Sequence, residues 1–258
     1  MTARCHLDSL LEPDGLTVVF QPVFSSAGGE RRPFGYEALT RGPAGTNFER
    51  ADVLFEYVRR KGREALVDRA CVATALRQYT TFRGEAMILL NVHAATIEGD
   101  AGFTAFLAET CRETAVPATS VILEVVEQQQ SCDERRFLEH VRALRALGAR
   151  VALDDVGMAY SSVRTMVEVR PDFFKVDAYF VRGSRQSAAV RTALWSIVRL
   201  AQDLGGSVVA EGIERTEDLD AAKEAGADLV QGYLLSRPMT AAAIRALDSD
   251  RNHGTHSD

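Results

Sequence analysis

Five short apolar segments along the chain each end on a residue that can bind a metal ion or move a proton. They are residues 88–90 before Asn91, 121–123 before Glu124, 151–153 before Asp154 and Asp155, 173–174 before Lys175, and 208–210 before Glu211. Continuous apolar runs of this length are typical of strands that are covered on both faces of a parallel sheet. Because parallel strands deliver their carboxyl ends to one face, we expect these polar side chains to converge into a single site.

Between these segments the apolar positions change to helical spacing. Phe137, Val141 and Leu144 recur at such spacing, and Gly148, a residue typical of helix ends, precedes the strand-like run at 151–153. The same unit recurs further along the chain. Alternating helices and short apolar strands predict βα units and a mostly parallel sheet.

The first third of the chain has a different pattern. The strand-like segments at 18–20 and 34–39 are joined by the turn-rich residues 25–32. This connection suits an antiparallel pair better than a helical crossover. A long helical stretch over about 51–79 follows, before the strand-like segment at 87–92.

The strand-like segments number about eight, which is what a closed α/β barrel needs. The main competing fold is an open doubly wound sheet, but no glycine-rich phosphate-binding sequence follows an early strand. No low-complexity linker divides the chain, so we expect a single barrel domain over residues 1–247. We expect residues 248–258 to form a disordered carboxyl-terminal tail.

The composition of the 258-residue chain is that of a soluble globular protein, with 46% hydrophobic and 26% charged residues. The formal net charge of −6 argues against general adhesion to nucleic acid or to an anionic membrane. The cysteines Cys5, Cys71, Cys111 and Cys132 match no metal-binding or redox spacing. No apolar run is long enough to span a membrane, and the first residues do not resemble a secretion signal, so we expect a cytoplasmic protein.

The polar residues near the strand ends suggest a metal site. An ionised carboxylate beside an apolar strand is costly unless it is paired or bound to a cation. Several oxygen ligands on one rim suit Mg²⁺, Mn²⁺ or Ca²⁺, and no histidines or cysteines converge to indicate structural zinc. The candidate ligands are Glu37, Asn91, Glu124, Asp154, Asp155 and Glu211. The competing interpretation is a rim of ordinary salt bridges with nearby arginines.

The adjacent Asp154 and Asp155 cannot both face inward from a regular strand, because neighbouring strand residues point to opposite faces. At the end of a strand the chain begins to turn, and both carboxylates can then approach one centre. The alternative is that Asp155 caps the following turn while Asp154 is solvated. Gln21 and Gln231 also lie near strand ends, where either amide can bind a ligand or satisfy loop backbone.

Lysine is rare in this chain, which contains only Lys61, Lys175 and Lys223. Lys175 lies inside a strand-like segment, where a partly desolvated lysine can form a Schiff base, bind phosphate or orient water. It can instead form a buried ion pair with Asp177 or with a carboxylate of the rim. An acidic rim favours the protonated form of Lys175, which argues against a lysine-dependent aldolase.

A series of short motifs spreads over almost the whole chain. They are Phe20-Gln21-Pro22-Val23, Glu37-Ala38-Leu39 followed by Thr40-Arg41-Gly42-Pro43, Asn91-Val92-His93, Glu124-Val125-Val126-Glu127, Asp154-Asp155-Val156-Gly157, Asp172-Phe173-Phe174-Lys175-Val176-Asp177, Glu211-Gly212-Ile213-Glu214, and Gln231-Gly232-Tyr233 with Arg237-Pro238. In content and order they resemble the EAL domain, the family of cyclic di-GMP phosphodiesterases. One triplet alone would be a weak signal, but the ordered set is highly specific.

The resemblance implies a TIM-like (β/α)8 barrel in which one early strand runs antiparallel. It also implies a site for two Mg²⁺ or Mn²⁺ ions, with Ca²⁺ inhibitory, held by the six candidate ligands given above. Lys175 and Gln231 would place or activate the attacking water, Glu211 would belong to the catalytic set, and Glu127 would hold the loop after the Asp pair. The implied substrate contacts are Gln21, Glu37, Leu39, Arg41, Asn91, Asp177, Glu214 and Gln231.

By the same resemblance, the domain cleaves one phosphodiester bond of cyclic di-GMP to give linear pGpG, and it forms a homodimer. The loop after the Asp pair departs from the family pattern at Val156, Met158 and Ala159, where members often carry Phe, then Thr or Ala, then Gly. Ala159 restricts the backbone, and Met158 removes a hydroxyl hydrogen bond. The alternative function is a non-catalytic or very slow cyclic di-GMP receptor, which ranks below catalysis because no metal ligand of the pattern is lost.

Overall fold

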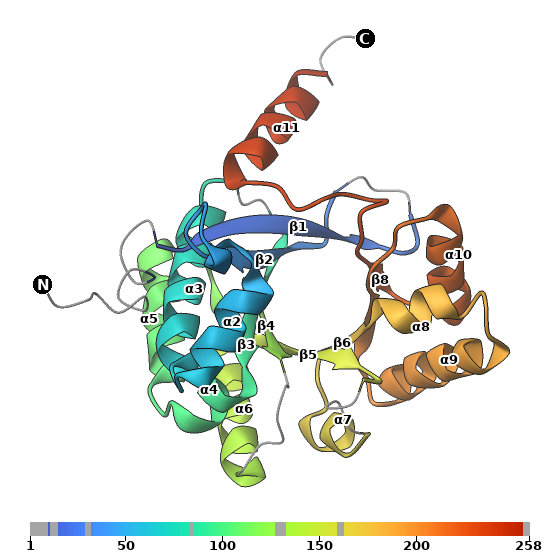
Figure 1. Cartoon of the computed structure of the whole chain (residues 1–258), viewed down its shortest axis with the longest axis horizontal. Helices are drawn as coiled ribbons and strands as arrows, with labels where there is room; N and C mark the ends of the chain where they lie inside the picture. Colours follow the sequence, from blue (N-terminus) through green and yellow to red (C-terminus); the bar gives the residue numbers. More distant parts are fainter. Residues whose placement is uncertain are drawn as a thin grey trace, which may run out of the picture.

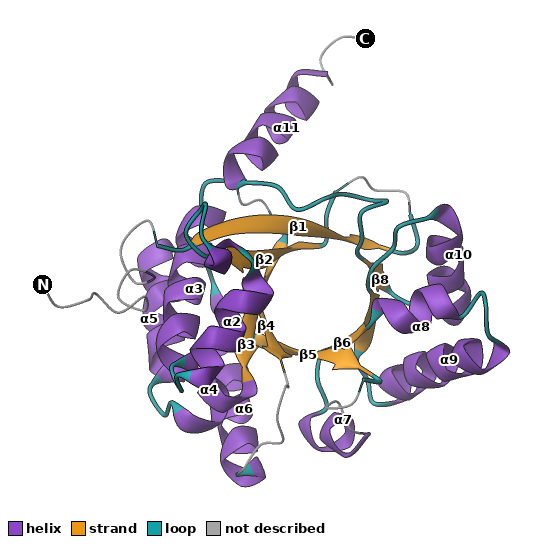
Figure 2. Cartoon of the chain, in the orientation of Figure 1, coloured by secondary structure: helices purple, strands orange, loops and turns teal. Residues whose placement is uncertain are grey.

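The computed structural model describes residues 10, 15–28, 32–82, 85–126, 133–158 and 163–254. Within these residues, eight strands form a closed ring, and helices cover its outside (Figures 1 and 2). The strands are β1 Thr17–Ser25, β2 Gly35–Arg41, β3 Met87–His93, β4 Val121–Val126, β5 Arg150–Val156, β6 Phe173–Val176, β7 Ser207–Ala210 and β8 Leu229–Val230. The predicted TIM-like α/β barrel is confirmed.

Strand β1 runs antiparallel to both of its neighbours, β2 and β8, whereas β2 to β8 are parallel to one another. The short connection between β1 and β2 therefore makes the antiparallel pair that the sequence predicts. The carboxyl ends of the parallel strands meet at one mouth of the barrel. Thr17, at the start of the reversed β1, pairs with Arg41 at this end of β2.

Helices lie in the connections from β2 onward, and α11 follows the last strand. They are α2 Ala51–Arg60, α3 Glu64–Tyr79, α4 Ala94–Gly99, α5 Phe103–Thr114, α6 Glu134–Leu147, α7 Val163–Val169, α8 Ala178–Gly183, α9 Ala188–Asp203, α10 Thr216–Ala225 and α11 Ala241–Gly254, with 3-10 turns η1 Asn47–Glu49 and η2 Ala118–Ser120. The helical stretch predicted over about 51–79 forms two helices, because the chain turns at Gly62, whose φ of 59° is left-handed backbone that glycine adopts readily. Among the helices described, none has the length and apolar content that crossing a bilayer requires.

The inside of the barrel holds an apolar layer beneath a polar one. The apolar layer is the buried cluster of Val23, Leu89, Ile122, Ala152, Phe173, Val209 and Leu229. Each of these lies two residues from a polar residue near the mouth, as Leu89 does from Asn91 and Ile122 from Glu124, so both face the same side of the strand. The apolar layer fills the barrel from below and leaves the polar layer at the mouth.

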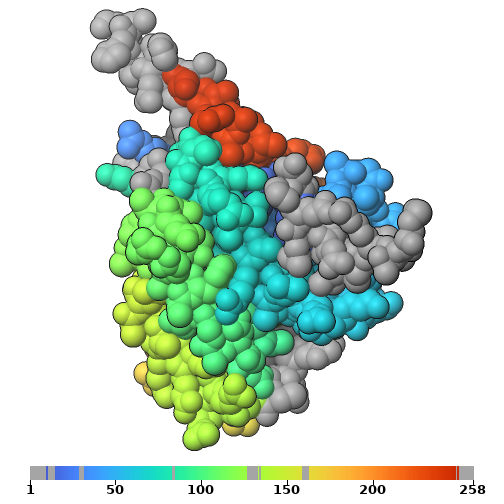
Figure 3. All heavy atoms as spheres, turned by 90° about the vertical axis from the view of Figure 1, so that its left-hand side faces the viewer, coloured from blue at the N-terminus to red at the C-terminus, as the bar shows by residue number. Residues whose placement is uncertain are grey.

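Helix α11 packs on the barrel through its first turns. Ile244 is only 2% exposed and belongs to the core cluster between strands and helices, and Phe20 and Met239 exchange two backbone hydrogen bonds just before this helix. The α11 ribbon points away from the barrel (Figure 1), and its described side chains lie at one end of the molecular surface (Figure 3). Residues 248–254 of the predicted disordered tail are thus helical, since the Ala-rich run 241–247 has high helix propensity and starts the helix ahead of them. Residues 255–258 lie outside the described part of the chain.

Candidate active site

The polar residues at the barrel mouth surround the ammonium group of Lys175. Its Nζ atom lies 2.8 Å from Glu211 Oε1, 3.2 Å from Glu124 Oε1, 3.4 Å from Asp154 Oδ1 and 3.6 Å from Glu37 Oε2. These carboxylates come from β2, β4, β5 and the residue that follows β7. The structure therefore brings together side chains that are far apart in the sequence.

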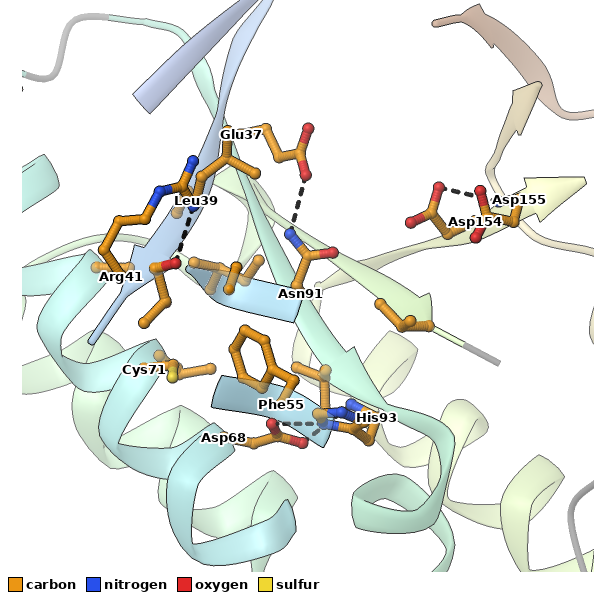
Figure 4. Close-up of a pocket in the computed structure, with 18 residues that line it drawn as sticks. Glu37, Leu39, Arg41, Phe55, Asp68, Cys71, Asn91, His93, Asp154 and Asp155 are labelled. Carbon is orange, nitrogen blue, oxygen red and sulfur yellow. Dashed lines mark hydrogen bonds and ion pairs between the residues drawn. The ribbon is translucent and has the colours of Figure 1, made fainter. Parts of the chain in front are cut away.

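Glu37 is a buried carboxylate with two hydrogen-bond donors. Asn91 Nδ2 donates to Glu37 Oε1 at 2.9 Å (Figure 4), and Gln231 Nε2 donates to Glu37 Oε2 at 2.8 Å. Burial raises the pKa of Glu37, but the charge of Lys175 and these two hydrogen bonds outweigh it, so the pKa lies below its usual value. Glu37 is therefore ionised at neutral pH.

Glu124 and Glu211 carry the opposite shift. Burial, followed by the charge of Glu37, raises the pKa of Glu124 well above its usual range. Burial also raises the pKa of Glu211 to about 8; the charges of Asp154 and Glu37 add to this effect, whereas Lys175 opposes it. One ammonium group is too little positive charge for the carboxylates that surround it.

The Asp pair lies where β5 becomes irregular. The pairing of β5 with β6 shifts between Leu153 and Val156, and Asp155 has a φ of 51°, a left-handed conformation that non-glycine residues rarely adopt. Because of this turn, oxygens of Asp154, Asp155 and Glu211 lie within 4.8 Å of one another. Partial desolvation, followed by the charges of Asp154 and Asp177, raises the pKa of Asp155 to about 6.

The arrangement fits a divalent cation. Both carboxylate oxygens of Glu124 and the amide oxygen Oε1 of Gln231 are buried without a hydrogen-bond partner among the described residues, although Glu124 lies close to Lys175. Buried acceptors of this kind need a partner. A hard cation coordinated by carboxylate and amide oxygens would supply it and would relieve the repulsion that raises the pKa of Glu211.

Two hollows open beside this cluster, and the predicted substrate contacts all lie in the walls of one or both. The first has a volume of about 270 Å³, and Glu37, Leu39, Arg41 and Asn91 line it (Figure 4). The second has a volume of about 300 Å³, and Gln21, Glu37, Asp177, Glu214 and Gln231 line it. The carboxylate of Asp177 accepts a hydrogen bond from Tyr179 N at 2.8 Å and caps α8, while Lys175 pairs with the rim carboxylates instead.

Some of the predicted loop features fall outside the described residues. Glu127, Ala159 and residues 160–162 belong to this group. Val156 is buried, and Met158 is 44% exposed. Gly157 is required by packing, because an added Cβ atom would lie 2.5 Å from the ring of Phe180.

Sequence reasoning missed Asp68 and His93, which line the first hollow. Asp68 is buried on α3 and accepts hydrogen bonds from His93 N and Nδ1, both at 2.9 Å, and from Thr96 Oγ1 at 2.5 Å (Figure 4). It thereby ties the end of β3 to α3. The sequence carried little signal for this pair, because apolar residues surround Asp68 on α3 without a clear helical face.

Known proteins with this pattern were found by sequence and by structure. The sequence model of the EAL domain family matches residues 4–238. The chain belongs to the EAL domain family.

Two relatives of this EAL domain are named cyclic di-GMP phosphodiesterases. The chain is 32% identical to RocR of Pseudomonas aeruginosa over 152 residues, which cover 59% of this chain and 38% of RocR. It is 27% identical to PdeR of Escherichia coli over 244 residues, which cover 93% of this chain and 36% of PdeR. The chain therefore spans less than two fifths of the length of these relatives.

The barrel of this EAL domain is also similar to that of Klebsiella pneumoniae BlrP1. The manganese and cyclic di-GMP complex of BlrP1 at pH 9.0 has a TM-score of 0.80 and 27% sequence identity, and the match covers 89% of this chain and 57% of BlrP1. A calcium and cyclic di-GMP complex of BlrP1 gives the same TM-score of 0.80. The family predicted from the motifs is confirmed.

Proposed function

We propose that this EAL domain hydrolyses one phosphodiester bond of cyclic di-GMP, giving linear pGpG, with two divalent cations at the barrel mouth. The main support is the group of oxygen ligands that four strand ends present around Lys175, with buried acceptors left unpartnered. The names of RocR and PdeR support the same reaction.

The cations, Mg²⁺ or Mn²⁺, would be held by one set of oxygen ligands. This set is Glu37, Asn91, Glu124, Asp154, Asp155 and Glu211. When bound, such cations neutralise an anionic phosphodiester and lower the pKa of a coordinated water. Ligands on separate strands are fixed before the substrate arrives, which limits reorganisation during the reaction. We expect Ca²⁺ to inhibit, because it is larger and accepts a looser geometry than Mg²⁺.

Lys175 and Gln231 would orient the attacking water. Burial lowers the pKa of Lys175, but the charges of Asp154, Glu124, Glu211 and Glu37 outweigh it and raise the pKa well above its usual value. Lys175 is thus a cationic donor rather than a base or a Schiff-base nucleophile. Gln231 donates to Glu37 through Nε2, and its buried Oε1 is available to accept a hydrogen bond from water.

The substrate would lie across the mouth and contact both hollows. Leu39 and Arg41 line the first hollow, and Asp177 and Glu214 line the second. An elongated dinucleotide whose phosphate sits over the carboxylate cluster would reach both sides. The role of Glu127 in holding the loop, homodimerisation and a cytoplasmic location stay predictions.

A second candidate function is a receptor that binds cyclic di-GMP without turnover, or with very slow turnover. One observation favours it: Met158 stands exposed in the loop after the Asp pair, at a position where the family pattern has a small residue or a hydroxyl. We rank it below hydrolysis because the sequence has lost none of the metal ligands of the family pattern.

The experiment is to incubate the purified protein with cyclic di-GMP and Mg²⁺, with and without chelator, and to separate the products by chromatography. We expect pGpG to form only with Mg²⁺ and to be lost in Glu37→Ala. The matched control is Glu224→Ala, an exposed residue of α10. Tight binding without product over a long incubation would establish the receptor function instead.

A further inference from the structure

An arginine of α8 holds the turn that follows Glu211. Arg182 Nε donates a hydrogen bond to the carbonyl oxygen of Gly212 at 2.9 Å, and Arg182 Nη2 donates to Glu214 Oε1 at 2.8 Å. One planar guanidinium group therefore bridges two points of the turn 211–214. A lysine has no such fixed pair of donors, so it cannot reproduce both bonds with the same geometry.

The other side of the same turn is fixed by backbone contacts. Ile213 N donates to the carbonyl oxygen of Gln231 at 3.0 Å, and Leu234 N donates to the carbonyl oxygen of Ile213 at 3.0 Å. Gly212 has a φ of 65°, and a Cβ atom added there would lie 2.3 Å from Cβ of Ala178 in α8. The turn is therefore pressed between the segment after β8 and helix α8, and Arg182 links it to that helix.

Glu211, a candidate metal ligand, begins this anchored turn. It lies just beyond the end of β7, and its carboxylate faces the like charges of Asp154 and Glu37. Lys175 Nζ holds the Glu211 carboxylate at 2.8 Å, but a movement of Glu211 away from the mouth would relieve its repulsion with Asp154 and Glu37. A turn that is anchored on both sides resists this movement.

We propose that Arg182 is a positioning residue of the metal site, which keeps the carboxylate of Glu211 near those of Asp154 and Asp155 by fixing the turn 211–214. The inference rests on the proposed function of this cluster as a metal centre. Arg182 touches none of the candidate metal ligands' side chains directly, so it acts through the backbone of the turn.

The ion pair itself contributes little to the stability of the barrel. The side chains of Arg182 and Glu214 are 43% and 46% exposed, and exposed ion pairs are weak. Substitution of Arg182 should therefore lower metal affinity and leave thermal stability nearly unchanged. Arg182 also lines the second hollow, so direct contact with an anionic substrate is the competing role that the experiment must separate.

The test is calorimetric titration of Mn²⁺ into the substrate-free protein, for Arg182→Gln and Arg182→Lys. The matched control is Arg199→Gln, an exposed arginine that pairs with Asp203 at 3.0 Å on α9, away from the mouth. We expect Arg182→Gln to weaken Mn²⁺ binding about 10-fold, as loss of residues that orient metal ligands does. Arg182→Lys should recover part of this loss, and Arg199→Gln should bind like the wild type.

Kinetics with cyclic di-GMP complete the experiment. At saturating Mn²⁺ we expect Arg182→Gln to recover the kcat of the wild type, because bound metal then holds Glu211 in place, whereas KM also reports the lost bond to Glu214. Wild-type Mn²⁺ affinity in Arg182→Gln overturns the positioning role, and a raised KM in that case assigns Arg182 to the substrate instead. If the wild-type protein itself neither binds Mn²⁺ nor forms product, the metal-dependent function fails, and the positioning role fails with it.

Discussion

At the scale of single residues, Lys175 carries the electrostatic balance of the barrel mouth. It is almost fully buried and lies within 3.6 Å of four carboxylates. Removal of one partner from a buried charge cluster leaves the others uncompensated, which costs about 3–5 kcal/mol. We expect Lys175→Met to lower the free energy of unfolding of the cation-free protein by about this amount, measured by urea denaturation in the presence of chelator.

Lys223→Met is the matched control, because Lys223 is exposed on α10. Added Mn²⁺ should restore part of the stability of Lys175→Met, since a divalent cation supplies the missing positive charge. Equal stability of the two lysine variants in chelator would show that Lys175 does not balance the cluster.

Glu211 gives a pH dependence with a defined sign. Its pKa rises from an ordinary value of 4.5 to about 8 through burial and the charge of Asp154. The folded protein therefore holds this proton more tightly than the unfolded chain does, so the stability of the cation-free protein falls as pH rises from 4.5 to about 8. A cation binds the ionised carboxylate, so we expect Mg²⁺ affinity to rise over the upper part of this interval.

The measurement is calorimetric titration of Mg²⁺ between about pH 6 and about pH 8 in buffers of different ionisation enthalpy, which reports the protons released. Proton release should be smaller in Glu211→Gln. An affinity that does not change with pH over this range would contradict the prediction.

The polar residues of the mouth were predictable from the sequence, because strand alternation places Asn91 and Glu124 on the same side as the apolar layer beneath them. Their partners were not. That Lys175 pairs with Glu211 rather than with Asp177 depends on distances across the barrel, which no spacing in the sequence encodes. Arg182 is one arginine among many, and only its contacts distinguish it.

At the scale of secondary-structure elements, the turn after β8 must pass very close to the turn after β7. A Cβ atom added at Gly232 would lie 2.1 Å from O and 2.2 Å from N of Ile213, so backbone would have to move. We expect Gly232→Ala to lower the free energy of unfolding by about 1–3 kcal/mol and to weaken Mn²⁺ binding. Chemical denaturation and metal titration measure the two effects.

Gly99→Ala provides the matched control for this turn. Gly99 lies at the end of α4, where an added Cβ atom meets open space. This variant should be as stable as the wild type or more stable, by up to about 1 kcal/mol. If the two alanine variants have the same free energy of unfolding, the close packing of the two turns does not contribute to stability.

Element boundaries were predictable only where the pattern changed. The helical stretch expected over about 51–79 was not divided, although residues 59–64 are polar or glycine, and the chain forms α2 and α3 there. The strands were easier, because short apolar runs such as β6 are bounded by polar residues on both sides. The β5 irregularity at Asp155 was anticipated from the adjacent carboxylates, but its left-handed backbone was not.

At the scale of the whole molecule, the packing of α11 indicates where the folded domain ends. Ile244 is buried against the core, whereas Leu247 is 44% exposed. We expect Ile244→Ala to cost about 2–5 kcal/mol of unfolding free energy and Leu247→Ala to cost less than about 0.5 kcal/mol. Deletion of residues 248–258 should leave urea stability within about 0.5 kcal/mol of the wild type. A large loss on this deletion would mean that the barrel domain extends past residue 247.

The closed barrel could be predicted because every level of the sequence agreed on it, from the count of strands to the order of the motifs. The rate of the proposed reaction and the surface through which two copies would associate could not be predicted. They depend on the loop after the Asp pair, part of which lies outside the described residues, and on surface complementarity, for which a sequence has no periodic signal.

The reversed first strand also decides where this domain can receive an input. In an all-parallel barrel the chain starts at the floor, opposite the ligand's entrance. Here the start of β1 lies beside the end of β2, so the chain enters the barrel at the same end as the candidate metal ligands. If the barrel binds cyclic di-GMP as proposed, a module joined ahead of this strand would be attached at the end of the barrel where the substrate enters.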